Sequence, residues 1–190
     1  ELLEDKYKAA TAAGGSFSPD ASSAGRRALR NACLTLLAAQ DSATDSARVA
    51  AHYKSATNMT DAAHALFLHA HKDTPARDRQ FSHFFERWQH DHLVIDMWFA
   101  AQAQSSLPDT LDRVMRLCDH PLFKLTTPNK IRALLGTFAM SNPVQFNRPD
   151  GAGYDFVAGK VLEIDRLNPQ VAARLLGAFR SFSALEPKRR

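Results

Sequence analysis

Glycine, cysteine and β-branched residues are all scarce in this sequence. Its 190 residues include eight glycines and two cysteines, and Val and Ile are few beside Ala and Leu. No segment alternates apolar and polar side chains, the pattern of a half-buried strand. Cys33 and Cys118 lie in apolar surroundings, so we expect buried free thiols in a reducing compartment rather than a disulfide framework. Together these absences exclude a sheet and favour an all-α fold.

Long apolar runs are also absent. No stretch approaches the length of a membrane span, and the acidic start, Glu1 to Asp5, lacks the basic region of a secretory signal peptide. We therefore expect a cytoplasmic protein with no membrane partner. Because the sequence has no initiator Met and stops soon after an amphipathic segment, we interpret both ends as cut points in a longer protein.

Neither sign of charge dominates the sequence. The formal net charge of +4 is the difference between 24 basic and 20 acidic residues, and the final Lys188, Arg189 and Arg190 contribute part of it. No stretch interleaves basic with aromatic side chains. We interpret this as an ordinary basic surface and expect no nucleic-acid partner; a helical nucleic-acid binder is the weaker alternative.

What the sequence does have is a succession of amphipathic helical patterns separated by short polar joints. Apolar residues recur at helical spacing in nine segments: 26–40, 46–53, 61–70, 75–88, 91–104, 108–117, 128–140, 152–165 and 169–184. Short joints between such helices imply antiparallel neighbours. We expect about eight to ten helices in a single domain over 1–190. Because no fixed repeat period is visible, the pattern alone leaves both a bundle and a superhelical stack open.

Several of these helices carry start signals. Thr127 and Asn168 each precede a proline at the first helical position, where either side chain can cap the exposed N–H groups. In 58–61 we expect Thr60 to cap the following helix. The polar loop 147–153, which ends in Gly-Ala-Gly, provides the freedom for a tight turn before the next helix.

The histidines do not form a convincing metal site. His83, Glu86 and His90 lie on one helix face, but one helix cannot close a tetrahedral zinc site and no second ligand cluster appears. The Ser, Thr and Cys residues show no nucleophile motif. We therefore expect no catalytic residue, no metal and no other cofactor in this chain.

Three long polar side chains are better candidates for binding. Gln170 and Arg174 share a face near the start of the last helix, and Arg132 lies in the first turns of the helix that starts at Pro128. Helix starts favour negative charge, and guanidinium groups add donors for carboxylates or peptide carbonyls. Ordinary solvated or ion-paired arginines are the competing interpretation.

The stretch 127–174, together with RRALRNACL (26–34), NMTDA (58–62) and LVIDMWFAAQA (93–103), resembles the C-terminal helical domain of bacterial aminopeptidase N, a gluzincin zinc metallopeptidase. The resemblance covers most of the chain. It implies a superhelical array of antiparallel helix pairs that arches over a catalytic domain lying upstream. It also implies a parent enzyme that uses zinc to remove N-terminal residues from peptides.

This chain lacks the zincin helix H-E-x-x-H, in which two His hold the metal and the Glu acts as base. It is therefore predicted to be inactive alone. The resemblance implies that this domain caps the parent's active-site chamber and controls peptide access to it. The resemblance implies that Arg132, Gln170 and Arg174 line the exit side of the peptide site. The implied partners are the parent's own catalytic domain and peptide substrates. The alternative is a stand-alone helical module that binds a protein or an acidic peptide.

Overall fold

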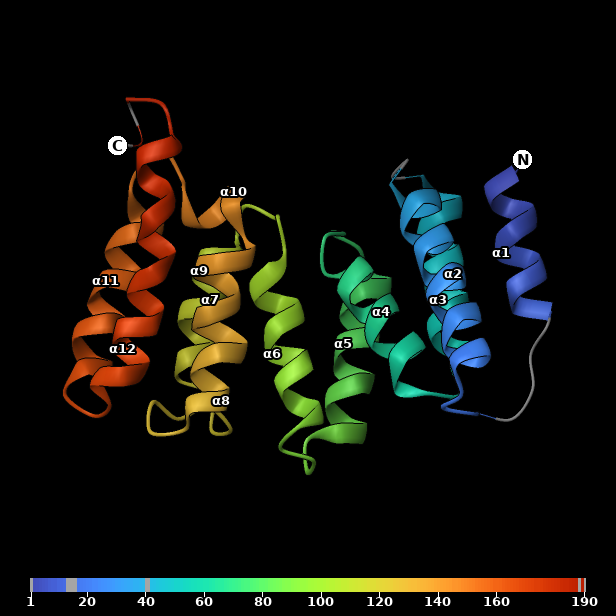
Figure 1. The fold of residues 1–190 in the computed structure, drawn as a ribbon, viewed down its shortest axis with the longest axis horizontal. Coiled ribbons are helices and arrows are strands. Elements are labelled where there is room, and N and C mark those ends of the chain that lie inside the picture. Colours follow the sequence, from blue (N-terminus) through green and yellow to red (C-terminus); the bar gives the residue numbers. More distant parts are fainter. Residues whose placement is uncertain (1, 13–16, 40–41, 188, 190) are drawn as a thin grey trace. The chain divides into compact units, whose positions relative to one another are not determined.

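The computed structural model describes residues 2–12, 17–39, 42–187 and 189, and within these ranges it contains helices and loops but no strand (Figure 1). The all-α prediction is confirmed. The chain divides into two compact units, Glu1–His83 and Phe84–Arg190, with the division inside helix α5 (Pro75–Trp88). Among the described residues, no helix is both long and apolar enough to cross a membrane.

The first unit is built from helix pairs. It contains four helices and the first part of α5: α1 (Leu2–Ala12), α2 (Ala21–Ala38), α3 (Ala43–Ser55) and α4 (Met59–His69). Helix α1 packs on α2, and α3 packs on α4. One apolar cluster of this unit consists of Leu34, Ala38, Val49 and Ala65, with partly buried neighbours that include Tyr53 and Leu68. Leu66 and Phe81 are also buried in this unit.

One cap in this unit differs from the prediction. Asn58, not Thr60, is the N-cap of α4: its side-chain oxygen accepts a hydrogen bond from the Asp61 N–H at 3.0 Å. A capping oxygen has to reach the N–H two or three residues further on. Asn58 meets that condition and leaves Thr60 inside the first turn.

The second unit holds the larger core. After the end of α5 come α6 (Val94–Gln104), α7 (Thr110–Cys118), α10 (Pro143–Phe146) and α11 (Ala152–Asp165). Two longer helical runs are made of consecutive parts. The first joins α8 (Pro128–Ile131), a π-helical turn (Arg132–Gly136) and α9 (Thr137–Ser141); the second joins α12 (Pro169–Leu176) to a 3-10 segment (Gly177–Ala184). All nine predicted segments are helical in the described part of the chain, and α1 and α10 are additional.

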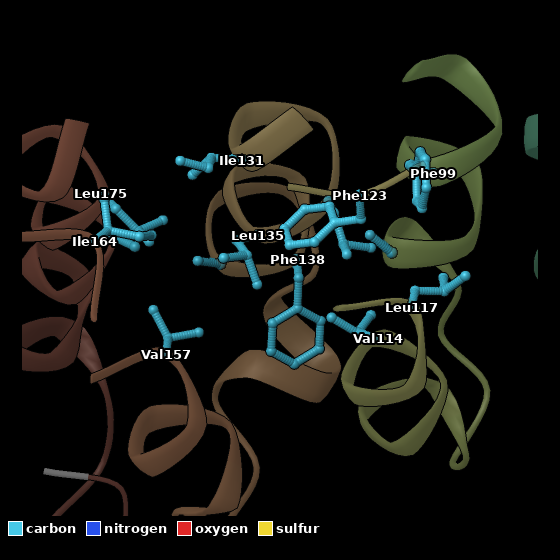
Figure 2. Close-up of a cluster of buried hydrophobic side chains, with 14 of the residues drawn as sticks. Phe99, Val114, Leu117, Phe123, Ile131, Leu135, Phe138, Val157, Ile164 and Leu175 are labelled. Atoms are coloured by element: carbon cyan, nitrogen blue, oxygen red, sulfur yellow. The ribbon is translucent and has the colours of Figure 1, made fainter. Parts of the chain in front are cut away.

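Apolar side chains from three helix layers meet in the second unit's core (Figure 2). Phe99 comes from α6, Leu135 from the run 128–141, and Ile164 and Leu175 from α11 and α12. Phe138 is fully buried and meets the Phe146 ring edge-on, with centroids 6.3 Å apart. This core includes residues of both long helical runs and of α11.

The loop before α11 depends on two glycines in different ways. Gly151 has φ 77°, in the left-handed region that suits a residue without Cβ, so the expected tight turn is confirmed. Gly153 is needed for space, because a Cβ there would lie 2.4 Å from the carbonyl oxygen of Phe146. The loop therefore brings α11 directly against the backbone of α10.

Candidate functional site

The two helices expected to carry the site begin where the sequence placed them, but with different caps. At the start of α12, Asn168 accepts a hydrogen bond from the Val171 N–H at 3.2 Å, so this side-chain cap is confirmed. The Thr127 side chain makes no capping bond. Instead its carbonyl oxygen accepts from the Ile131 N–H at 3.2 Å. Pro128 has no backbone N–H and therefore needs no acceptor at the first helical position.

A buried lysine fixes the start of the helical run 128–141. Lys130 donates from Nζ to the carbonyl oxygen of His92 at 3.0 Å and to the Asp96 carboxylate at 2.5 Å. The same ammonium lies 5.6 Å from the centre of the Phe99 ring. Since both partners belong to α6 or the loop before it, Lys130 turns one side of the helix toward α6 and leaves Arg132 on the solvent side.

Arg132 begins a π-helical turn, Arg132–Gly136. The N–H of Thr137 reaches back five residues to the carbonyl oxygen of Arg132, which inserts one extra residue into the turn. Such turns are rare and frequently occur at functional sites, because they re-aim side chains that a regular α-helix would place elsewhere. The turn and α12 both contribute residues to one pocket.

The run 128–141 and α12 enclose a pocket of about 220 Å³. Its lining residues are Pro128, Ile131, Arg132, Gly136, Met140, Val171, Arg174 and Leu175. Two of the three predicted site residues, Arg132 and Arg174, are thus brought to one pocket although 42 positions separate them. Gln170 is exposed on α12 and is not among the lining residues.

The pocket combines an apolar wall with two positive groups. Apart from Arg132 and Arg174, the lining residues are apolar, and none carries a carboxylate. The Arg132 guanidinium donates to the side-chain oxygen of Asn129, a neutral partner. Within the described residues, neither guanidinium forms an ion pair. The arrangement is suited to binding a ligand that has both an anionic and an apolar group, and the lining includes no nucleophile or general base.

The other candidates are used structurally. His69 is fully buried and contacts Gln80, and burial lowers its pKa. His83 lies 2.9 Å from the Tyr53 hydroxyl. Cys33 is buried and Cys118 partly buried, both as free thiols, and burial raises the pKa of Cys118 to about 11. In the ranges that the structure describes, no group of three or more His, Cys, Asp or Glu side chains is placed to hold a metal ion.

Sequence reasoning missed the apolar part of this site. Gly136 and Met140 continue the helix face of Arg132 at intervals of four, and Val171 and Leu175 flank Arg174 at helical spacing. Met140 is 56% exposed, but Leu162, Leu93 and other large apolar side chains are more exposed, so exposure alone does not mark this face. The sequence by itself offered no reason to separate these residues from those of the core.

Comparisons with known proteins place the whole chain. A family model described as "Domain of unknown function (DUF3458_C) ARM repeats" matches residues 1–190. Aminopeptidase N of Caulobacter vibrioides is 44% identical over 171 residues, 88% of this chain and 20% of that protein. Aminopeptidase N of Escherichia coli is 39% identical over 151 residues, 80% of this chain and 17% of that protein.

A solved structure agrees with these matches. The crystal structure of Legionella pneumophila aminopeptidase A in complex with aspartic acid has a TM-score of 0.86 and 29% identity to this chain, and the match covers 99% of this chain and 23% of that one. The chain therefore spans about a fifth of the length of the curated relatives. The ARM-repeat description agrees with the predicted fold class, a superhelical array of antiparallel helix pairs.

Proposed function

The chain belongs to the DUF3458_C family of ARM-repeat domains, and we propose that it is the C-terminal domain of a bacterial, cytoplasmic, zinc-dependent aminopeptidase N. In this proposal residues 1–190 act as one domain, and the catalytic domain lies upstream in the same protein. The parent enzyme removes N-terminal residues from peptides. The matches to about a fifth of two aminopeptidase N chains support this assignment.

The zinc of the parent enzyme belongs outside this chain. No set of metal-holding side chains occurs among the residues described here, so the present residues do not fit a zinc site. The role proposed for this domain is to cover the active-site chamber and to limit access to peptides. Its own side chains bind and orient the part of the peptide downstream of the cleaved bond.

One observation carries this role: Arg132 and Arg174 converge on a single pocket without a carboxylate partner in the described structure. A guanidinium presents donors in a planar fork that matches a carboxylate or a peptide carbonyl. We assign both arginines to binding the downstream part of the peptide. Gln170, exposed one turn before Arg174, is assigned to the same segment of the ligand.

The proposal is tested by steady-state kinetics in the full-length enzyme. We expect Arg174→Ala to lower kcat/KM for a tripeptide about ten- to hundredfold, because a hydrogen bond to a charged group contributes about 1.5–3 kcal/mol. An aminoacyl anilide lacks the downstream residues and is expected to be turned over almost normally. Arg180→Ala is the matched control, since Arg180 is exposed on the same helical run and does not line the pocket.

Two results would contradict the proposal. Equal losses on the tripeptide and the anilide would mean that Arg174 supports the structure and not the peptide. Chelator-sensitive hydrolysis by the pure 190-residue chain would contradict the assignment of all catalysis to the upstream domain. A coding sequence without H-E-x-x-H upstream would favour the alternative, a stand-alone helical module that binds proteins or peptides.

A further inference from the structure

The pocket between the two helical runs is of a size that suits one side chain. Its volume is about 220 Å³, below the roughly 300–1,000 Å³ of pockets that hold drug-sized ligands. An apolar cavity of about 150 Å³ already accepts a benzene ring. A leucine, methionine or phenylalanine side chain therefore fits, whereas several residues of a peptide do not.

The walls of this pocket are largely pre-formed. Ile131 and Leu175, which lie on facing helices in Figure 2, are both nearly fully buried and belong to the core. Gly136 contributes wall without a side chain. Because the apolar walls are held by the core, a ligand side chain enters without first ordering the surface.

The two guanidinium groups limit what accompanies that side chain. Arg132 and Arg174 line the same small pocket from opposite helices, and no acidic residue lines it. Two guanidinium groups favour a group with full negative charge and two oxygens over a neutral carbonyl. An aspartate or glutamate side chain would satisfy the charge but leave the apolar wall empty.

We infer that this pocket binds the C-terminal residue of a short peptide, with an apolar side chain against Ile131, Met140 and Val171 and the terminal carboxylate on Arg132 and Arg174. The inference rests on the proposed function in taking a peptide as the ligand. It adds a substrate class: short peptides that end in a free, apolar C-terminal residue. Longer peptides place their C-terminus elsewhere and lose this contribution.

The methionine methyl groups provide a direct binding assay on the 190-residue chain. The sequence has four methionines, and Met140 is the one that lines the pocket. Met115 and Met97 are also exposed, at 46% and 36%, and they report non-specific binding to apolar surface. In a methyl-labelled sample, N-acetyl-leucine is expected to shift the Met140 signal and leave the Met97 and Met115 signals unchanged.

Two related compounds separate the two halves of the pocket. N-acetyl-leucinamide lacks the carboxylate, and N-acetylglycine lacks the apolar side chain. Each is expected to bind at least about tenfold more weakly than N-acetyl-leucine, because each loses either a charge-assisted contact or the burial of a leucine side chain. Equal binding of all three compounds, or no movement of the Met140 signal with any of them, would overturn the inference.

Single substitutions test which pocket residue contacts each part of the ligand. Arg174→Gln is expected to reduce the affinity for N-acetyl-leucine to that of the amide, while leaving binding of the amide unchanged. Gly136→Leu places an apolar side chain in the pocket and is expected to weaken both compounds. Arg180→Gln, outside the pocket, is the control. A loss of N-acetyl-leucine binding in Arg180→Gln equal to that in Arg174→Gln would overturn the assignment.

The full-length enzyme completes the test. A tripeptide ending in leucine is expected to have about tenfold higher kcat/KM than its C-terminal amide or the same peptide ending in aspartate. Binding at Met140 combined with equal losses on tripeptide and anilide in Arg174→Ala would retain the pocket and reject the proposed function. Tripeptide-selective kinetics without Met140 binding would reject the pocket inference alone.

Discussion

The two compact units of this chain differ in which side chains they bury, although both are made of helices. Among the described residues, the first unit buries several charged or ionisable groups beside its apolar side chains; these are Asp45, His52, Asp61, His69 and Arg77. In its described part, the second unit buries a large cluster of aromatic and aliphatic side chains and a single charged residue, Lys130. The comparison teaches that two units of one fold class can differ in how much of their buried interior is charged and how much is apolar.

The charged centre of the first unit is Asp61. It forms an ion pair with Arg30, accepts a hydrogen bond from the Asn58 amide at 2.6 Å, and lies 3.7 Å from His52. Burial raises the pKa of Asp61, but its contacts with His52, Asn58 and Arg30 outweigh burial and lower the pKa to about 2. The folded state of this unit therefore depends on the ionised carboxylate.

The largest expected effect lies in the second unit. Phe138→Ala should reduce the free energy of unfolding by about 3–5 kcal/mol, because it leaves a cavity in the aromatic core. Phe138 is fully buried. Hydrogen exchange is expected to accelerate in 93–165 much more than in 20–70. Phe182→Ala is the control, since Phe182 is 49% exposed; an equal loss in both variants would contradict the packing argument.

Asp61→Ala should have the next largest effect, in the first unit. Removing one partner of a buried ion pair leaves Arg30 without its carboxylate, and we expect a loss of about 3 kcal/mol, the lower end of such effects because Arg30 is partly solvated. Hydrogen exchange should accelerate in residues 20–70 before it accelerates in residues 93–165. Asp73→Ala, at an exposed position in the same unit, should change stability little. A neutral result for Asp61→Ala would remove the electrostatic half of the comparison.

Gly153→Ala should destabilise the second unit by about 1–3 kcal/mol. The added Cβ would meet the backbone oxygen of Phe146 at 2.4 Å, and such overpacking is relieved by shifting α11. Gly159→Ala is a sharp control in the same helix, because nothing lies within 4 Å of its Cβ and alanine favours helix. Thermal unfolding should therefore move in opposite directions for the two variants.

The smallest expected effect is a loss of stability in acid, which should appear in the first unit before the second. The folded-state pKa of Asp61 is lowered to about 2, so its contribution is complete above the unfolded pKa near 4. It is lost as the pH falls from about 4 to 2, at a cost of about 1–2 kcal/mol. Exchange measured down this range should increase in 20–70 before 93–165, and Asp61→Asn should remove most of that difference. If both units lost their protection from hydrogen exchange at the same pH, this prediction would be contradicted.

Local sequence signals were sufficient for most helices and insufficient for two. The nine predicted segments have apolar residues at helical spacing, a pattern that depends only on near neighbours. Helix α1 has no buried residue and α10 is four residues long, so neither leaves a clear apolar stripe. Thr60 was misassigned as a cap because both it and Asn58 are capping residues, and only the hydrogen bond to Asp61 separates them.

The candidate site was also only partly predictable from local sequence signals. Arg132, Gln170 and Arg174 were selected from the sequence because helix starts and guanidinium groups are visible in local order. Only the three-dimensional structure shows that Arg132 and Arg174 line one pocket and that Gln170 lies outside its lining. Whether these residues bind peptide stays a prediction.

The sequence by itself determined the all-α class, the helix boundaries marked by Pro128 and Pro169, and the turn that needs Gly151, because each depends on backbone preferences within a few residues. Only the tertiary structure decided that Asp61 is buried among charges and that Arg132 meets Arg174 across an apolar pocket. The physical reason is that burial and pocket shape depend on which distant side chains fill the neighbouring space, and a pocket is defined by space that none of them fills.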